Sequence, residues 1–359
     1  MKGMDEMEIY HIWFNELRGV PLYEKKILLA LLGDPKAIYD RTEKELKELL
    51  DLWYFSEPQH KKTSSSITKD LDPAWRIYEG NQLFGIKILT FEDPLYRVRA
   101  NSSVSSPLLL YYRGKLQNAN IGTVGIVGSR KATAHGKRAA RLACQQIKGV
   151  GGENENLVVI SGLSEGINAV VHEDALSQDR VSYAFTAQGL ASCQSHSLAD
   201  LMSRIVEVGA VLSPFPLGTH LRSYQYPKSN AVMAAWMDEL VVIEARAASG
   251  VLSLARSVMH NGSVVRVVPG NVFLPNCKGS NQLFLEGAQA FIPDINETAE
   301  VTGLRQGVID LLIDMALTTQ ELSDKLGLGL SEVEAELMEM EMDDAVQYRA
   351  DGRWHSLME

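Results

Sequence analysis

The spacing of hydrophobic positions changes twice along the chain. Residues 8–52 carry apolar side chains at helical spacing, with turn signals at Gly19 and Gly33. From about 122 to 292 the apolar residues instead gather in short β-branched runs, and residues 304–346 return to helical spacing. The pattern therefore predicts a helical region, then a mixed one, then a second helical one.

The mixed region is predicted to form a parallel sheet. Its runs are apolar on both faces, which indicates strands that are covered on both sides. Helix-like segments separate the runs, and this alternation indicates a doubly wound α/β domain. The predicted strands are TVGIVGS, NLVVISG, VSYAFTAQG, GAVLSPFP, ELVVIEAR and SVVRVVPG, and two more are expected upstream at 85–93 and 107–114.

The two ends of the chain carry helix-capping and turn signals. Thr42 is predicted to cap a helix, with Glu45 in the capping-box position, and the polar residues 56–72 are expected to be a linker or loop. Near the other end, Thr319 and Ser331 are predicted to cap the second and third helices. Asp351 and Gly352 then predict the turn of a β-hairpin. Three helices followed by a hairpin predict a winged helix.

Composition and cysteine count limit the class of protein. The chain has 359 residues, 45% of them hydrophobic, which is enough for two or three domains. Apolar runs are shorter than the ~18–20 residues that a membrane span needs. The first residues are acidic where a signal peptide is basic, so we expect a cytoplasmic protein. Cys144, Cys193 and Cys277 are far apart and show neither metal-ligand spacing nor a disulfide framework.

Charge is unevenly distributed. Residues 301–359 carry 13 acidic and 4 basic side chains, a net charge of −9 out of −10 for the whole chain. In contrast, residues 127–148 carry six Lys or Arg and no acid. A basic patch is therefore compatible with an acidic protein.

The basic segment directly follows the first predicted strand of the mixed region. Ligands of open parallel sheets bind beyond the carboxyl ends of the strands. There Gly128 permits a sharp turn, Ser129 can donate to a phosphate, and Arg130 and Lys131 add charge beside a helix N-terminus. A solvated basic helix face explains the same charges equally well.

Two further segments have the same strand–turn–helix form. In the second, Ser161, Gly162 and Gly166 can cradle an anion with backbone N–H groups, whereas His172 lacks the spacing of a catalytic triad and is interpreted as a packing residue.

In the third segment, Glu244 ends a strand, and Ser249 and Gly250 open a helix. Glu244 is predicted to bond a neighbouring loop or a ligand, or else to belong to a turn. The sequence motifs of nucleotide-binding sites are not present here. A P-loop requires Gly where Lys131 stands and Ser or Thr where Arg138 stands. The dinucleotide-binding motif G-x-G-x-x-G is absent from residues 122–128.

Taken in order, these segments resemble the DNA-processing protein A family (DprA, also called Smf). Each motif is weak alone, but five in the same order cover nearly the whole chain. They are GIVGSRKATAHGKRAARLA, VVISGLSEGINAVVHEDAL, VVIEARAASGVLSLA, VVPGN followed by GSNQLFLEGAQAFI, and upstream GIKILTFEDPLYRVRANSSVSSPLLLYYRG. The resemblance implies a Rossmann-like domain at 73–300, a small SAM-like helical domain with its linker at 1–72, and a winged helix at 301–359.

The resemblance also implies a non-enzymatic function without a cofactor. The family binds single-stranded DNA, dimerises through the Rossmann-like domain and helps to load RecA recombinase on incoming DNA during natural transformation. The DNA-binding residues expected here are Gly128, Ser129, Arg130, Lys131, Lys137, Ser161, Gly162, Gly166, Lys228, Asn230, Ser249 and Gly250.

One element departs from the family pattern. The F-P-x-R-N-R element is replaced by YPKSNA, so Ser229 and Ala231 stand where two arginines are expected. Losing two phosphate partners should weaken DNA binding by about one to two powers of ten at moderate salt. The alternatives are a nucleotide-sensing or nucleotide-cleaving Rossmann-like protein, and an interaction scaffold with a weakened DNA pocket.

Overall fold

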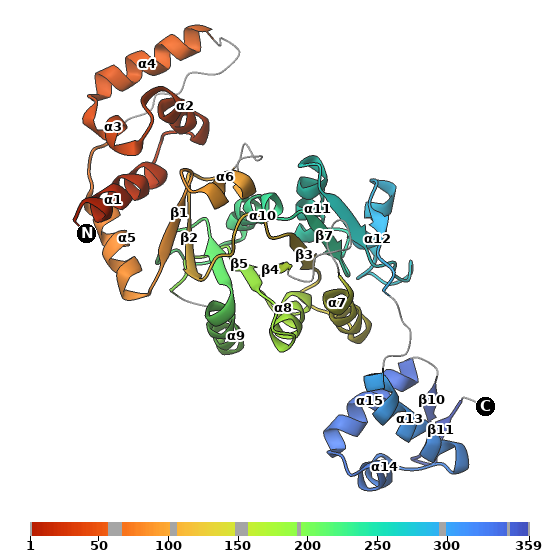
Figure 1. The fold of residues 1–359 in the computed structure, drawn as a ribbon. Coiled ribbons are helices and arrows are strands. Elements are labelled where there is room, and N and C mark those ends of the chain that lie inside the picture. The colour runs from red at the N-terminus through yellow and green to blue at the C-terminus, as the bar shows by residue number, and fades with distance from the viewer. Residues whose placement is uncertain are drawn as a thin grey trace. The chain divides into compact units, whose positions relative to one another are not determined.

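The computed structural model describes residues 2–56, 67–100, 106–147, 157–191, 195–293, 299–342 and 345–357. It divides into two compact units, Met1–Ile292 and Pro293–Glu359 (Figure 1). Most of the expected loop at 56–72, together with Cys193, lies outside the described residues. In the described part of the chain, no helix is long and apolar enough to span a bilayer.

Within the described residues, nine strands form one sheet in the first unit. The order is β1-β2-β6-β5-β4-β3-β7-β8-β9. From β6 to β9 all neighbouring strands are parallel, whereas β2 is antiparallel to both β1 and β6. The strands are β1 (Lys87–Thr90), β2 (Leu109–Gly114), β3 (Thr123–Val127), β4 (Val158–Gly162), β5 (Ser182–Phe185), β6 (Ala210–Ser213), β7 (Glu239–Val242), β8 (Val264–Val267) and β9 (Gln289–Ala290). The predicted doubly wound, mostly parallel sheet is confirmed.

Helices cover both faces of this sheet (Figure 1). Every residue of β3 is buried, and successive side chains enter opposite cores: Val124 and Ile126 pack with α7 and α8, while Val127 packs with α10 and α11. This explains why the strand runs are apolar on both faces. The helices that follow β2 along the first unit are α7 (Ala134–Gln146), α8 (Ile167–Ser177), α9 (His196–Val208), the short 3₁₀ turn η1 (Ser223–Gln225), α10 (Tyr226–Ala235), α11 (Gly250–His260) and α12 (Lys278–Leu285).

The N-terminal helices pack on the β2 side of the sheet. Leu108 N–H donates to Asn15 Oδ1 at 3.2 Å, and the Tyr111 hydroxyl donates to Glu16 at 3.0 Å. The predicted capping box is confirmed, because Thr42 N–H donates to Glu45 Oε2 at 2.7 Å and Glu45 N–H donates to Thr42 Oγ1 at 3.3 Å. The helices are α1 (Lys2–Glu16), α2 (Leu22–Leu32), α3 (Pro35–Asp40), α4 (Glu43–Ser56), α5 (Asp72–Leu83) and, between β1 and β2, α6 (Pro94–Ala100).

The second unit has its own core. Val308, Leu312, Leu322, Val333 and Leu337 are buried together. Its elements are α13 (Ala299–Asp314), α14 (Thr319–Leu326), α15 (Leu330–Met342) and an antiparallel pair, β10 (Val346–Tyr348) and β11 (Trp354–Ser356). These three helices and the hairpin are the elements from which a winged helix was predicted, and that assignment stays a prediction.

Two predicted helix caps in this unit are wrong, Thr319 by one residue and Ser331 by two. Thr318, not Thr319, caps α14: its Oγ1 accepts the Glu321 N–H at 3.2 Å, and its own N–H donates to Glu321. Thr319 is the first helical residue, and its hydroxyl accepts from Trp354 Nε1 at 3.1 Å. Ser331 lies inside α15, which begins at Leu330. Adjacent Thr residues satisfy the same local pattern, so packing decides which one caps.

Candidate nucleic-acid interface

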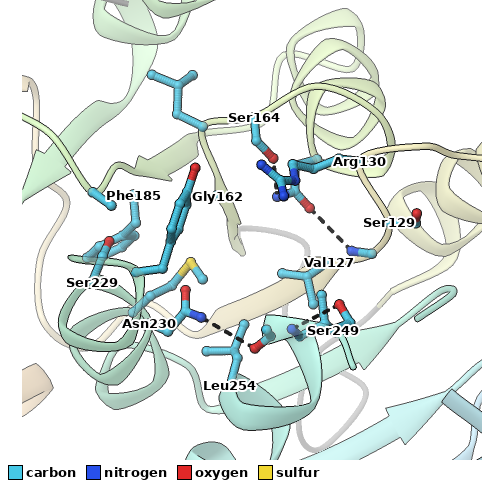
Figure 2. Close-up of a pocket in the computed structure, with 18 of the residues that line it drawn as sticks. Val127, Ser129, Arg130, Gly162, Ser164, Phe185, Ser229, Asn230, Ser249 and Leu254 are labelled. Atoms are coloured by element: carbon cyan, nitrogen blue, oxygen red, sulfur yellow. Dashed lines mark hydrogen bonds between the residues drawn. The ribbon is translucent and has the colours of Figure 1, made fainter. Parts of the chain in front are cut away.

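A cavity of about 710 Å³ opens at the carboxyl ends of β3, β4 and β5, between the sheet and the starts of α10 and α11 (Figure 2). Because β4 and β7 lie on opposite sides of β3, the strand order reverses here. Open α/β sheets bind ligands at such a reversal, where the loops on the two sides diverge. The lining residues are Val127–Lys131, Gly162–Glu165, Asn168, Phe185–Ala187, Tyr226, Ser229, Asn230, Met233, Arg246, Ala248–Val251 and Leu254.

The cavity has an apolar floor and a cationic mouth. Phe185, Met233 and Leu254 are buried beneath it, while Arg130, Lys131 and Arg246 are exposed around it. Figure 2 places Arg130 across the cavity from Phe185. Positive charges beside an apolar floor suit a ligand that combines anionic groups with flat rings.

The loop after β3 is fixed by its own hydrogen bonds. The Ser129 hydroxyl donates to Lys131 O at 3.0 Å and accepts the Lys131 N–H at 3.2 Å. The Gly128 N–H donates to Asn168 Oδ1 at 3.3 Å, and Asn168 Nδ2 donates to Ser164 Oγ at 2.9 Å. Asn168 therefore ties the loops after β3 and β4 together, so the cavity wall is held in place without a ligand.

Gly166 makes a close approach that no larger residue permits. Its φ is +81°, and a Cβ at this position would lie 2.4 Å from the carbonyl oxygen of Ser129. The next residue, Ile167, donates its N–H to the same Ser129 carbonyl at 3.0 Å. The role of Gly166 is thus to let the loop after β3 lie against the start of α8.

The opposite wall is built by α10 and α11. Ser249 caps α11 by accepting the Val251 N–H at 3.2 Å, and Asn230 Nδ2 donates to Gly250 O at 3.4 Å. Ser229 is buried and donates to the carbonyl of Thr186 at 3.0 Å. This wall thus presents serine hydroxyls and a carboxamide, and no cation.

Eight of the twelve expected DNA-binding residues line the cavity together: Gly128, Ser129, Arg130, Lys131, Gly162, Asn230, Ser249 and Gly250. The other four are placed elsewhere. Ser161 is fully buried and bonds the Ile126 carbonyl at 2.7 Å, and Gly166 supports the loop from behind. Lys137 is exposed on α7, and Lys228 Nζ donates to Pro214 O at 3.4 Å beside the ring of Phe215.

Sequence reasoning missed three lining residues that carry chemistry. Arg246 follows β7 by four residues and is the third cation of the mouth. Phe185 is the last residue of β5, and Tyr226 opens α10 with its ring 6.0 Å from the Arg130 guanidinium. A position at the end of a parallel strand, or shortly after it, was the available signal for Phe185 and Arg246. For Tyr226 the signal was only the YPKSNA element.

His172 packs inside the protein, as interpreted from the sequence. It is fully buried, and its Nδ1 lies 2.7 Å from the Ser182 hydroxyl. Burial lowers the pKa of His172 to about 4, so the ring is neutral at pH 7. In the described part of the chain, no group of three His, Cys, Asp or Glu side chains is placed to hold a metal ion.

Comparison with known proteins agrees with this architecture. The family model of DNA recombination-mediator protein A matches residues 87–302, which hold the sheet and the cavity. The chain belongs to the DNA recombination-mediator protein A family. Membership confirms the resemblance that the ordered motifs indicated.

Individual relatives are similar over part of their length. Protein Smf of Escherichia coli (strain K12) is 28% identical over 202 residues, which cover 56% of this chain and 53% of Smf. The chain thus matches about half the length of that relative. DNA processing protein DprA of Streptococcus pneumoniae is 29% identical over 197 residues, covering 55% of this chain and 68% of that protein.

A solved structure shares the fold. The X-ray structure of DNA processing protein A from Streptococcus pneumoniae superposes with a TM-score of 0.62 at 20% sequence identity. The match covers 79% of this chain and 94% of that one. The similarity supports the Rossmann-like architecture.

Proposed function

We propose that the chain is a cytoplasmic recombination mediator that binds single-stranded DNA and helps to load RecA recombinase on it. The observation that carries the proposal is the cavity at the reversal of strand order, with Arg130, Lys131 and Arg246 exposed at its mouth. A protein that binds single strands of any sequence needs cations for the phosphates and apolar or aromatic surface for the bases.

The hydrogen-bonding groups of the cavity favour recognition of the backbone over recognition of bases. The Asn168 carboxamide is bonded on both sides, to the Gly128 N–H and to Ser164. The hydroxyls of Ser129 and Ser229 already donate to backbone carbonyls. Few side chains are therefore left to read base edges, so we expect affinity to depend strongly on salt and weakly on sequence.

The proposed site has fewer cations than the family pattern implies. Ser229, where an arginine is expected, is buried in the wall and bonds a carbonyl, so it offers no charge to a phosphate. Arg246 also lines the cavity, and we expect its charge to compensate for part of this loss. We expect binding that is weaker than a site with both arginines would give, but still specific for single strands.

Two partners follow from the same proposal. The family resemblance implies a dimer through the Rossmann-like domain, and two cavities on one strand would then increase affinity through effective concentration. The chain is also expected to contact RecA while holding the strand. Light scattering at tens of micromolar, with and without oligonucleotide, tests the dimer, and a monomer under both conditions would contradict it.

A second candidate function is nucleotide sensing. The observation in its favour is the size of the cavity, about 710 Å³, which suits a single nucleotide. The two functions differ in what competes for the site. A sensor binds mononucleotides tightly and gains little from a longer strand, whereas a strand binder gains affinity with every phosphate it contacts.

The deciding experiment is a titration of the full chain with fluorescent oligo-dT at several salt concentrations, with mononucleotides and duplex DNA as competitors. The proposal expects affinity that falls steeply with salt and competition by unlabelled oligo-dT alone. Displacement of the strand by stoichiometric mononucleotide would favour the sensor. Absence of binding at low salt would refute the DNA-binding proposal.

A further inference from the structure

The loop that joins β8 to α12, residues 268–277, exposes three consecutive apolar side chains. Val272 is 66% exposed, Phe273 is 86% exposed and Leu274 is 46% exposed. Single apolar side chains are common on protein surfaces, but three in a row at the tip of a loop indicate a surface that contacts a partner.

This loop is held in one conformation by hydrogen bonds. Asn271 Oδ1 accepts the Phe273 N–H at 2.9 Å, and Asn271 O accepts the Leu274 N–H at 3.1 Å. At its base, Gly270 and Asn281 exchange two bonds, at 3.2 and 2.8 Å. Phe273 is thus presented on a fixed backbone, which lowers the entropy that a contact would cost.

The loop is joined directly to the mouth of the cavity. Asn276 Oδ1 accepts a bond from Arg246 Nε at 2.8 Å, and Asn276 Nδ2 donates to Lys131 O at 3.4 Å. Arg246 and Lys131 both line the cavity. Phe273 is three residues from Asn276, so their backbones are at most about 11 Å apart. The loop tip that carries Phe273 is therefore close along the chain to a residue that bonds two residues of the mouth.

The charge along this segment of the chain favours an anionic partner. No acidic residue occurs between Glu244 and Glu286, while Arg246 and Lys278 flank the loop and are exposed. A strand of DNA carries both groups that such a surface accommodates, a phosphate for each cation and a flat base for the ring. A protein partner usually presents both acidic and basic side chains, and this segment offers only cations to pair with them.

We propose that Phe273 is a stacking platform for a base of the single strand where the strand leaves the cavity. The inference rests on the proposed DNA-binding function and adds to it a residue that contacts a base. Because every base has a flat face, stacking on Phe273 adds affinity and leaves sequence tolerance unchanged.

The test compares the full chain with Phe273→Ala, Phe273→Tyr and a matched control, Phe55→Ala, whose ring is 89% exposed on α4. Each is titrated with oligo-dT and with a strand of the same length made of abasic sites. Phe273→Ala should weaken oligo-dT binding about 5- to 150-fold, the range expected for one stacked base, without changing the salt slope. Phe273→Tyr and Phe55→Ala should bind like the parent chain, and the abasic strand should not distinguish Phe273→Ala from it.

Three results would overturn the platform. Phe273→Ala could bind oligo-dT as tightly as the parent, or lose equal affinity for the abasic strand. It could also turn a dimer into a monomer in light scattering while each cavity binds a short strand unchanged, which would make Phe273 a contact between copies. If the parent chain bound no oligo-dT, the proposed DNA-binding function itself would fail. If the parent chain bound oligo-dT and Phe273→Ala bound it equally well, only the stacking platform would fail.

Discussion

Glu244 and Thr133 join the two sides of the strand reversal. The Glu244 carboxylate accepts the Thr133 backbone N–H and its hydroxyl, each at 2.9 Å, and is 3% exposed. Thr133 in turn caps α7 by accepting the Gly136 N–H at 2.9 Å. The carboxylate thus bonds a neighbouring loop, one of the roles the sequence left open for it. It also fixes the segment that carries Arg130 and Lys131.

Replacing this carboxylate should cost stability. In Glu244→Ala the donors of Thr133 lose a buried charged acceptor, and we expect the free energy of unfolding to fall by about 2–3 kcal/mol. Urea denaturation measures the change. Glu207→Ala removes an exposed carboxylate from α9 and should change stability by less than about 0.5 kcal/mol. Equal effects would show that the Thr133 bonds contribute nothing.

Removing Arg130 should weaken DNA binding more than removing Arg141. Arg130 lines the cavity, whereas Arg141 is exposed on α7 and does not. For Arg130→Ala we expect a loss of about a power of ten or less, independent of sequence. The slope of log affinity against log salt should fall by roughly 0.7, the value for one single-strand phosphate contact.

Lys131→Ala should lose less than Arg130→Ala, because arginine holds a phosphate in two hydrogen bonds and lysine is a point charge. Titration with oligo-dT at several salt concentrations measures all three variants. The same loss in Arg130→Ala and Arg141→Ala would favour a solvated basic face over a site at this turn.

Restoring a cation at position 229 should strengthen binding. Ser229 is one of the residues that line the cavity wall. For Ser229→Arg we expect affinity for oligo-dT to rise by up to about tenfold and the salt slope to steepen by roughly 0.7. Ser229→Ala is the control and should show no gain. A folded Ser229→Arg variant with unchanged slope would contradict a phosphate path along this wall.

Acid should destabilise the protein through His172. Burial lowers its pKa to about 4, against about 6.5 in the unfolded chain, so the unfolded state binds the extra proton between these values. Stability from this residue is complete above pH 6.5 and is lost as the pH falls towards 4. Between pH 7.5 and 5 the loss should be about 2 kcal/mol.

The pH effect is isolated by comparing the parent chain with His172→Gln. The difference between their free energies of unfolding, from urea denaturation at pH 7.5 and at pH 5, should shrink by that amount in acid. A difference that is constant with pH would mean that His172 titrates normally.

Deleting residues 301–359 should leave oligonucleotide binding unchanged or tighter. The third helix of this region and the residues after it, SEVEAELMEMEMDD, contain seven acids and no base, so we expect this helix to repel phosphate. The deleted residues all belong to the second compact unit, and the first unit, which holds the cavity, is left intact. Fluorescence titration at low salt is the most sensitive measurement. Weaker binding after the deletion would show that this unit contributes to the DNA site.

The sequence by itself determined where the strands lie and which of their ends carry chemistry. Runs such as 123–129 and 158–162 are apolar on both faces because both faces are covered, and this pattern is local. It also placed Gly128, Arg130 and Ser249 after strands, where parallel topology brings them together. Local spacing decides the position and exposure of an element.

Only the tertiary structure decided what lies opposite these residues. Three features join segments that are far apart in sequence. Strand β2 pairs with β6, Ser229 bonds Thr186, and Arg246 lies at the mouth of the cavity. Ser161 and Lys228 match family motifs, yet one is buried between strands and the other bonds Pro214. Which strands pair, and which side chains then face the cavity, depends on burial of apolar surface across the whole domain, and no local pattern carries that information.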